Sequence, residues 1–460
     1  MIGLPPFLSF SENERTLQLK TLMIILRTVK NISSLNIAAS VLLFLAAILA
    51  AVVANSSLSP VYQDFLLQEL HLRIGNFNLF SHGGHPLKMI EFINDCLMTV
   101  FFLAVGLEIK RELLVGELSS VRKAALPFIA ACGGMVVPVV IYALSVASGT
   151  PETRGMAIPM ATDIAFSLGV LSLLGKRVPL SLKIFLTAFA VVDDIGGILV
   201  IALFYSADVA YGYLIAAAVL YVFLYYMGKF GVTQKIFFLF FGVIIWYLFL
   251  QSGIHSTISG VILAFVIPAR PRLDAGKYIE RIRDIIGEFP VSKSDNIVLT
   301  NAQIATLKQV ERASDYVISP LQSLEDNLHG AVSFVILPLF AFANAGVVFS
   351  GSGSIVGDVS IAVAAGLLLG KFLGIYLFTW LAVKSGVALM PAGMNWKNIA
   401  GVSLLGGIGF TVSLFIANLS FADEYPELLN QAKFGVLVGT VLAGVLGYVV
   451  LNLVLPEREK

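Results

Sequence analysis

Long apolar runs separated by short polar connections fill almost the whole chain. A membrane-spanning helix needs about 20 mostly apolar residues to cross the hydrocarbon core of a bilayer. By that measure the sequence predicts twelve spans, at residues 36–55, 89–108, 124–147, 156–175, 180–205, 210–228, 234–251, 254–269, 326–349, 359–382, 398–419 and 431–455. The pattern indicates an all-α polytopic membrane protein.

The composition of the 460 residues supports this class. Hydrophobic residues make up 58% and charged residues 13%, whereas a soluble domain averages about 45–50% apolar and about 25% charged. These values exclude a globular enzyme in water, and the high hydrophobicity excludes a disordered chain. The net charge of +1 gives no reason to expect nucleic acid as a partner, and Cys96 and Cys132 form no metal-ligand or disulfide pattern.

The distribution of Lys and Arg predicts the orientation, because these residues concentrate in cytoplasmic loops. Alternate connections are rich in Lys and Arg, so both termini are expected in the cytoplasm. The first 35 residues are too long and too charged for an ordinary cleaved signal peptide. The predicted organisation is a cytoplasmic N-terminal segment 1–35, spans in 36–270, a cytoplasmic polar insert 271–325, spans in 326–455 and a cytoplasmic C-terminus 456–460.

Two segments outside the spans have patterns of their own. In residues 71–80 apolar positions alternate around Gly75-Asn76, which favours a short outer hairpin over an irregular loop. In residues 271–318, Ile279, Ile282, Ile286 and Phe289 recur at helical spacing. This predicts a short amphipathic helix lying against the membrane or the bundle.

Five ionisable residues lie well inside predicted spans, away from the span ends: Asp95, Asp163, Asp193, Asp194 and Lys371. Each costs at least about 2.5–3.5 kcal/mol at the bilayer centre, so each is a candidate functional residue. Successive helical positions point about 100° apart. We therefore expect one acid of the Asp193-Asp194 pair to face a water-filled cavity and the other to pair with Lys371. A purely stabilising Asp–Lys bridge would explain only one of the two acids.

This pair suits an alkali cation. Na⁺ prefers hard oxygen ligands such as carboxylates, hydroxyls and carbonyls. Burial favours the protonated form of a carboxyl group, and a nearby ammonium favours the ionised form. A proton and a sodium ion can then compete for the same oxygens, and a site exposed alternately to each side performs exchange.

Two spans are expected to be broken at membrane depth. Pro159 removes a backbone donor in mid-span, and Thr162 and Asp163 offer side-chain partners to freed backbone groups. Irregular backbone at that depth must line a cavity or be buried in protein. An acid such as Asp163 suits the N-termini of half-helices, and a base such as Lys371 suits their C-termini.

The second break is predicted at Gly406, Gly407 and Gly409, just before Thr411. The alternative for these glycines is close packing between unbroken helices.

Several long motifs resemble the NhaA-type bacterial sodium/proton antiporters. The resemblance covers residues 36–455 apart from the insert 271–318. It rests on INDCLMTVFFLAVGLEIKREL, PMATDIAFSLG, RVPLSLKIFLTAFAVVDDIGGILVIALFY, SGIHSTISGVILAF, ILPLFAFANAGV and GIGFTVSLFIA. Interrupted helices at corresponding positions of two halves of a chain indicate the binding site of a transporter. The NhaA-type antiporters are among the proteins from which this general rule was drawn.

The resemblance implies a twelve-helix inner-membrane protein with inverted repeats, two broken helices that cross at the membrane centre and a homodimer formed through the outer hairpin. It implies electrogenic exchange of Na⁺ or Li⁺ for H⁺, for sodium and pH homeostasis, with no cofactor beyond the transported ions. Asp193 and Asp194 resemble the ion- and proton-binding pair, with Lys371 bridged to Asp193. Asp163 and Thr162 resemble the residues at the helix crossing.

The resemblance also ties Glu108, Glu112, Glu325 and His255 to pH regulation. The sequence around His255, taken alone, instead favours a packed histidine at a helix end. Gln322 and Ser323 stand where familiar members carry basic residues, which weakens this cluster.

Three other classes of membrane protein fit the sequence less well. An intramembrane aspartyl protease needs two acids facing each other from different helices. A passive channel would show a filter of repeated polar residues, and none is evident. A sodium-coupled symporter is the serious alternative, and an organic solute that changes sodium flux would identify it.

Overall fold

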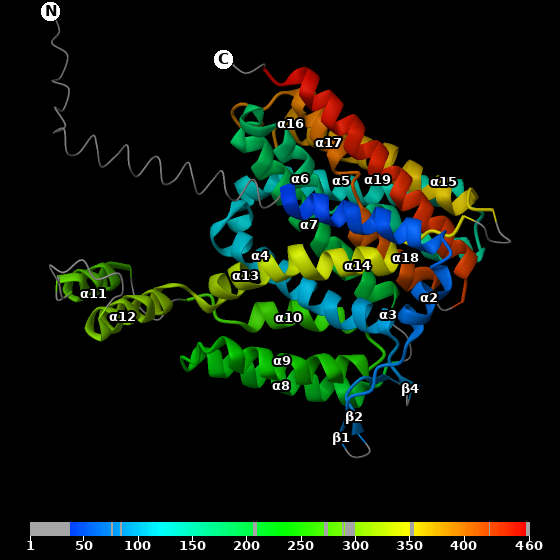
Figure 1. Ribbon diagram of the computed structural model, residues 1–460. Coiled ribbons are helices and arrows are strands. Elements are labelled where there is room, and N and C mark those ends of the chain that lie inside the picture. Colours follow the sequence, from blue (N-terminus) through cyan, green and yellow to red (C-terminus); the bar gives the residue numbers. More distant parts are fainter. Residues whose placement is uncertain are drawn as a thin grey trace, which may run out of the picture.

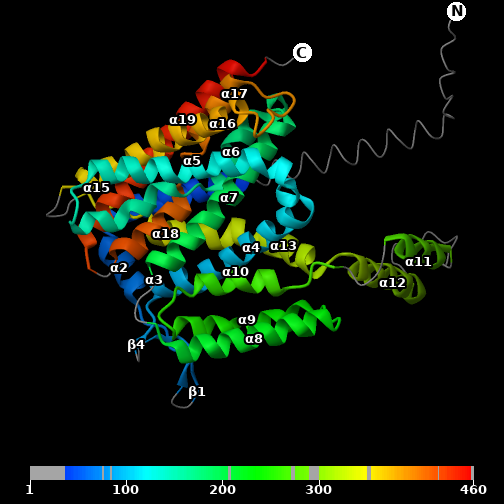
Figure 2. The ribbon, with the colours of Figure 1, turned by 180° about the vertical axis from the view of Figure 1, so that it is seen from behind.

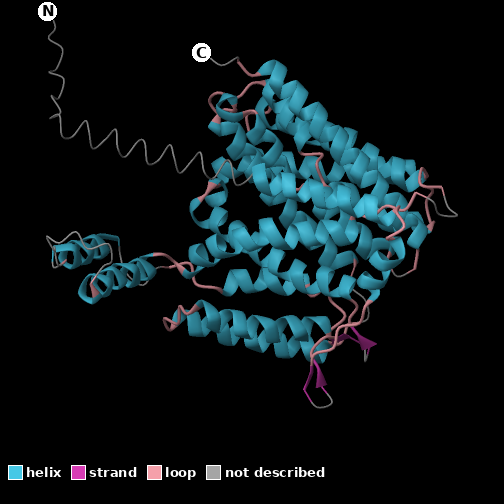
Figure 3. Ribbon diagram, in the orientation of Figure 1, coloured by secondary structure: helices cyan, strands magenta, loops and turns pink. Residues whose placement is uncertain are grey.

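The computed structural model describes residues 37–456 except 75–76, 83–84, 206–208, 271–274, 288, 290–299, 350–353 and 423. The predicted segment 1–35 and residues 457–460 of the predicted C-terminal segment 456–460 lie outside the described residues. The described chain is mostly helical (Figure 3). The all-α class predicted from the apolar runs is confirmed.

Nine helices in the described part of the chain are long and apolar enough to span a membrane. They are Ile37–Ala54, Met89–Val115 (α3 Met89–Phe92, η1 Ile93–Leu97, α4 Met98–Val115), Val121–Ser145 (α5), Leu180–Phe204 (α7), Tyr211–Lys229 (α8), Lys235–Ser252 (α9 is Lys235–Leu250), Pro320–Asn344 (α13 Pro320–Ala331, η5 Val332–Ile336, α14 Leu337–Asn344), Asp358–Lys384 (α15 Asp358–Ala365, η6 Gly366–Gly370, α16 Lys371–Lys384) and Pro426–Val454 (α19).

Two further spans are bent pairs of helices, which brings the possible number of spans to eleven. They are η3 (Pro151–Met160) with α6 (Ile164–Leu173), bent by 45°, and α17 (Trp396–Leu405) with α18 (Phe410–Phe421), bent by 44°. Both breaks predicted from the sequence are therefore present.

The remaining predicted span, 254–269, contains only a ten-residue helix, α10 (Thr257–Val266). Gly253 ahead of it has φ +80, a turn conformation that favours glycine, and Pro268 follows it. The apolar run is thus longer than its helix.

The helices form two groups that meet along the centre of the bundle (Figure 1, Figure 2). In one group α5 packs on α16 and α7, while α15, α17 and α18 pack on α19. In the other, α10 and α13 pack on α4, and α8 packs on α9. Contacts of α4 with α7 and of α14 with α18 join the two groups.

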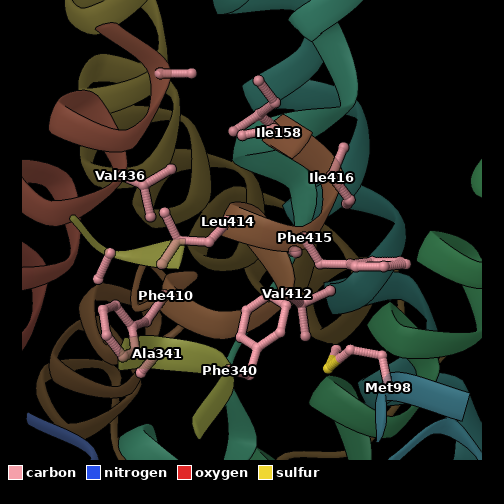
Figure 4. Packing of buried hydrophobic residues seen from close by; sticks show 14 of the residues in the cluster. Met98, Ile158, Phe340, Ala341, Phe410, Val412, Leu414, Phe415, Ile416 and Val436 are labelled. Carbon is pink, nitrogen blue, oxygen red and sulfur yellow. The ribbon is translucent and has the colours of Figure 1, made fainter. Parts of the chain in front are cut away.

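A buried polar chain crosses the same boundary. Asn418 Nδ2 in α18 donates to Asn344 Oδ1 in α14 at 2.8 Å, and Asn344 Nδ2 donates to Asn94 Oδ1 at 2.8 Å. Around it, apolar side chains from both groups interdigitate: Phe340 and Ala341 of α14 lie near Phe410, Val412 and Phe415 of α18 (Figure 4). The second broken helix is held on this core.

Short strands form the connection between the first two spans. β1 (Arg73–Ile74) pairs antiparallel with β2 (Phe77–Asn78), as the alternation in 71–80 predicted. A second antiparallel pair, β3 (Ser81–His82) and β4 (His85–Pro86), follows it. The preceding helix α2 (Ser59–Leu67) links this region to the first span.

The polar insert contains two helices that pack on each other, α11 (Ala275–Gly287) and α12 (Asn301–Val317). The predicted amphipathic helix corresponds to α11, whereas α12 was not predicted. Both views show this pair standing away from the bundle (Figure 1, Figure 2). The span that follows begins at Pro320, ahead of the predicted residue 326.

Candidate ion-binding site

The two broken helices cross at their breaks. Residues 161–163 separate η3 from α6, and residues 406–409 separate α17 from α18. The Asp163 N–H donates to Ile408 O at 2.6 Å, which ties the two connecting segments together. Backbone groups freed by the breaks therefore satisfy each other within the protein, as buried polar groups must.

Asp163 caps both half-helices that start at the crossing. Its Oδ1 accepts from the Phe166 N–H at 3.0 Å in the first turn of α6. Its Oδ2 accepts from the Thr411 N–H at 3.2 Å and from the Thr411 hydroxyl at 2.6 Å, in the first turn of α18. A carboxylate placed between two helix N-termini is stabilised by both dipoles, as expected from the sequence.

The half-helix α17 ends at the crossing, and hydroxyl groups donate hydrogen bonds to its last carbonyl groups. Thr162 Oγ1 donates to Gly406 O at 2.8 Å, and Ser167 Oγ donates to Leu405 O at 3.0 Å. Lys371 was expected at the C-termini of the half-helices. Among the described residues, no hydrogen bond or ion pair joins Lys371 to these C-termini. Side-chain hydroxyls took that position because they reach the carbonyls without burying a further charge.

The glycines at the second break allow close approach as well as the bend. A Cβ at Gly407 would lie 2.3 Å from Leu367 O, a backbone atom that cannot move aside easily. A Cβ at Gly409 would lie 2.2 Å from Ser413 Oγ and 3.1 Å from Ala161 O of the opposite broken span. Both interpretations of this cluster therefore hold: the helix is broken there, and it is closely packed.

Lys371 forms a buried ion pair with Asp193. Its Nζ lies 2.5 Å from Asp193 Oδ2, and both side chains are essentially inaccessible to solvent. Lys371 follows η6, a turn of π-helix, and such turns recur at functional sites. Within the described part of the chain, Asp193 Oδ1 is buried without a hydrogen-bond partner. One oxygen of this carboxylate is thus neutralised and the other is available.

Asp194 faces a cavity instead. A cavity of about 280 Å³ is lined by Asp163 and Asp194 at its deep end and by Glu108, Arg111 and Glu325 towards one end of the bundle. The two neighbouring acids therefore have different surroundings, as their 100° separation on α7 required. Four acidic side chains and Arg111 are therefore concentrated around this cavity.

The acids tied to pH regulation gather around one arginine. Arg111 lies 3.3 Å from Glu325, 3.2 Å from Glu112 and 3.8 Å from Glu108. All of these side chains except that of Arg111 are less than one-third exposed. One guanidinium thus connects α4 with α13, and protonation of any of the three acids would change its balance of charge.

His255 lies away from this cluster. Lys110, next to Arg111, donates to the carbonyls of Phe265 and Ile267 at the C-terminal end of α10. His255 precedes the other end of that helix, and ten helical residues rise about 15 Å. The structure brings three of the four suggested residues together and leaves His255 apart.

The residues at the two departures from the family pattern have polar partners. Ser323 accepts a hydrogen bond from Lys235 at 2.5 Å, and Gln322 pairs with Ser319 at 3.1 Å. Glu325 is paired with Arg111.

Sequence reasoning missed two residues of the site, Arg111 and Thr411. Arg111 could have been found from its place between Glu108 and Glu112, at helical spacing. Thr411 offers no such local signal, because its contact with Asp163 depends on the crossing of distant segments.

A multi-span bundle in which two broken helices cross at buried carboxylates defines an ion-coupled secondary transporter. Residues 30–451 match the family described as Na+/H+ antiporter 1. The chain is 74% identical over 438 residues to the Na(+)/H(+) antiporter NhaA of Bacteroides thetaiotaomicron, which covers 95% of this chain and 100% of the relative. It is 75% identical over 437 residues to that of Bacteroides fragilis, with 95% and 100% covered. It is 42% identical over 424 residues to antiporter NhaA 1 of Saccharophagus degradans, with 91% and 90% covered. The chain belongs to the NhaA-type Na⁺/H⁺ antiporter family.

Proposed function

We propose that the protein exchanges cytoplasmic Na⁺ or Li⁺ for external protons at the Asp193-Asp194 pair by alternating access. One observation carries this proposal: adjacent acids with opposite surroundings, Asp193 paired to Lys371 and Asp194 lining a cavity. A transported ion must leave as easily as it enters. A site that combines a carboxylate at the end of a cavity with the nearby positive charge of Lys371 meets that need.

The available ligands suit a small hard cation. The described residues contain no cluster of three or more His, Cys, Asp or Glu side chains that could hold a metal ion. An ion at the pair would complete its coordination with water and with hydroxyl or carbonyl oxygens, among them the hydroxyl of Thr162, which contacts Asp193. Such mixed oxygen sites bind alkali cations weakly enough for release.

Competition between proton and sodium follows from the charges at the site. Asp163, Asp193 and Asp194 are at most 8% exposed, and Lys371 is fully buried. With all four groups ionised the site carries two uncompensated negative charges, which is costly in a low-dielectric interior. Cations of either kind relieve that cost, so Na⁺ is expelled when protons bind. With two acids in the pair we expect more than one proton per Na⁺, which makes the exchange electrogenic.

The cavity beside Asp194 supports access from one side at a time. It reaches the acids from the end of the bundle that carries Glu108 and Glu325. By the Lys and Arg bias this end is cytoplasmic, in the bacterial inner membrane. The state described here then faces inward, and movement of the crossing segments would expose Asp194 to the other side. The outer hairpin is the proposed homodimer contact.

The test uses inverted membrane vesicles from cells that lack other sodium/proton antiporters. A pH-sensitive dye is quenched by respiration, and each cation is then added in turn. Na⁺ and Li⁺ should restore fluorescence, and this should fail in Asp194→Asn vesicles with equal amounts of protein. A response that needs an added organic solute would instead indicate symport.

A further inference from the structure

A second and larger cavity lies on the far side of the ion site. Its volume is about 950 Å³, and it lies between α5, η3, α7 and α18. Its walls are mainly apolar: Met135, Val136, Val139, Val140, Leu199 and Val200. The cavity has the size of a ligand pocket, for which about 300–1,000 Å³ is usual.

The cavity opens sideways through residues on the outer face of the bundle. Val136 and Val140 of α5 are 54% and 49% exposed, and Leu199 and Phe204 of α7 are 56% and 76% exposed. Both helices are membrane spans, so apolar side chains on their outer faces lie in hydrocarbon. The cavity is therefore a groove continuous with the acyl chains of the bilayer, and water would not fill its apolar part.

One end of the groove is polar and carries a single cation, Arg154, together with Thr153, Tyr205 and Ser420. The Tyr205 hydroxyl donates to Arg154 O at 2.7 Å and so fixes the backbone that carries the guanidinium. Arg154 Nη1 lies 2.9 Å from Glu424, and the side chain is half exposed. A guanidinium has five N–H donors and suits bidentate contact with phosphate.

We propose that this groove binds a phospholipid of the bilayer, with an acyl chain along α5 and α7 and its phosphate at Arg154. An apolar groove that ends at a guanidinium matches an anionic amphiphile and matches neither a soluble anion nor a purely apolar solute. This site is distinct from the ion site, whose cavity opens at the opposite end of the bundle.

The groove ends close to the ion site. Its floor includes Gly196, three residues after Asp193, and Met160, two residues before Thr162. A Cβ at Gly196 would lie 2.1 Å from Met135 Sδ, so this wall is closely packed. The bound acyl chain would stabilise the wall that separates the groove from the acids of the ion site. That consequence rests on the proposed function, whereas lipid binding itself does not.

The test is photolabelling in proteoliposomes with phosphatidylglycerol that carries a diazirine in one acyl chain. Labelled peptides are mapped by mass spectrometry. Label should concentrate on groove residues of α5 and α7. Val139→Trp, which fills the groove, should lower that label at least fivefold. The control Val219→Trp adds the same bulk on α8, where Val219 is 62% exposed, and should leave the label unchanged.

The phosphate contact is tested separately. Arg154→Gln should lower groove labelling at least threefold. Glu424→Gln removes the same ion pair but keeps the guanidinium, and it should preserve or raise the label. Only variants that elute as a single species are compared, and Val200→Trp replaces Val139→Trp if the latter does not fold.

Several results would overturn the proposal. They are uniform labelling of all lipid-facing helices, groove labelling that is unaffected by the Trp variant that fills the groove, and labelling insensitive to Arg154→Gln. A cross-link through the groove to a second copy of the chain would also overturn it, because the groove would then be a subunit interface. Labelling is measured without transport, so failure here leaves the antiport proposal standing.

Discussion

Replacing Asp163 by Ala should weaken the crossing of the broken helices, because it removes the side chain that caps both half-helices. The carboxylate accepts three hydrogen bonds, from the Phe166 N–H, the Thr411 N–H and the Thr411 hydroxyl. Each buried donor left without an acceptor costs about 1–3 kcal/mol. Removing a buried charge relieves part of that loss. The expected net result is destabilisation by a few kcal/mol, together with impaired transport.

Two further variants give a graded series. Asp163→Asn keeps one acceptor oxygen and should be milder, because Asn also caps helices well. Thr411→Val removes a single hydrogen bond to a charged group, worth about 1.5–3 kcal/mol. Thermal midpoints in detergent, read by tryptophan fluorescence, should fall in the order wild type, Thr411→Val, Asp163→Asn, Asp163→Ala.

The same proteins are assayed for antiport after reconstitution. A wild-type midpoint and wild-type transport for Asp163→Ala would show that the double cap is incidental. A larger loss for Thr411→Val than for Asp163→Ala would refute the hydrogen-bond reasoning, because the threonine contributes only part of what the carboxylate holds.

Three other predictions concern regulation, packing and the ion pair. The double variant Glu112→Gln, Glu325→Gln removes two acids that contact Arg111. Its curve of antiport activity against pH should be shifted or broadened relative to wild type. A curve superimposable on wild type would mean that these acids only occupy the membrane interface. Gly407→Val should abolish stable expression, since its Cβ would meet Leu367 O at 2.3 Å, and well-folded protein in size-exclusion chromatography would contradict this. Lys371→Met leaves Asp193 buried without its counter-charge, which costs about 3–5 kcal/mol. The protein should then lose thermal stability strongly, and an unchanged midpoint would argue against the pair.

The spans could be predicted because composition alone determines them. A run of apolar residues has few alternatives to a membrane helix, and the exceptions have local causes. The 254–269 run shrank to α10 because a positive-φ glycine and a proline flank it. The span after the insert begins at Pro320, whereas the prediction began it at residue 326. Its first turns carry Glu325 and other polar residues, which a search for apolar runs leaves out.

The site could be predicted only in part, for a different reason. Charges inside apolar runs identify Asp163, Asp193 and Lys371 directly, since such residues are costly without a role. Which groups they contact depends on helices that meet far apart in sequence. The Thr411 contact spans 248 positions, and the placement of His255 away from the acids follows from the position of α10. No local pattern contains that information.

We propose that Na⁺ and H⁺ compete for the carboxylates at the end of the cavity, and the binding of Na⁺ to the purified protein measures this competition. Binding is measured by isothermal titration or radioactive sodium at several pH values, for wild type and Asp194→Asn. In the acidic range, where protons occupy the site, each competing proton should weaken the apparent affinity for Na⁺ about tenfold per pH unit. Asp194→Asn should show no saturable binding at any pH. Sodium binding that is independent of pH, or undiminished in Asp194→Asn, would contradict the account.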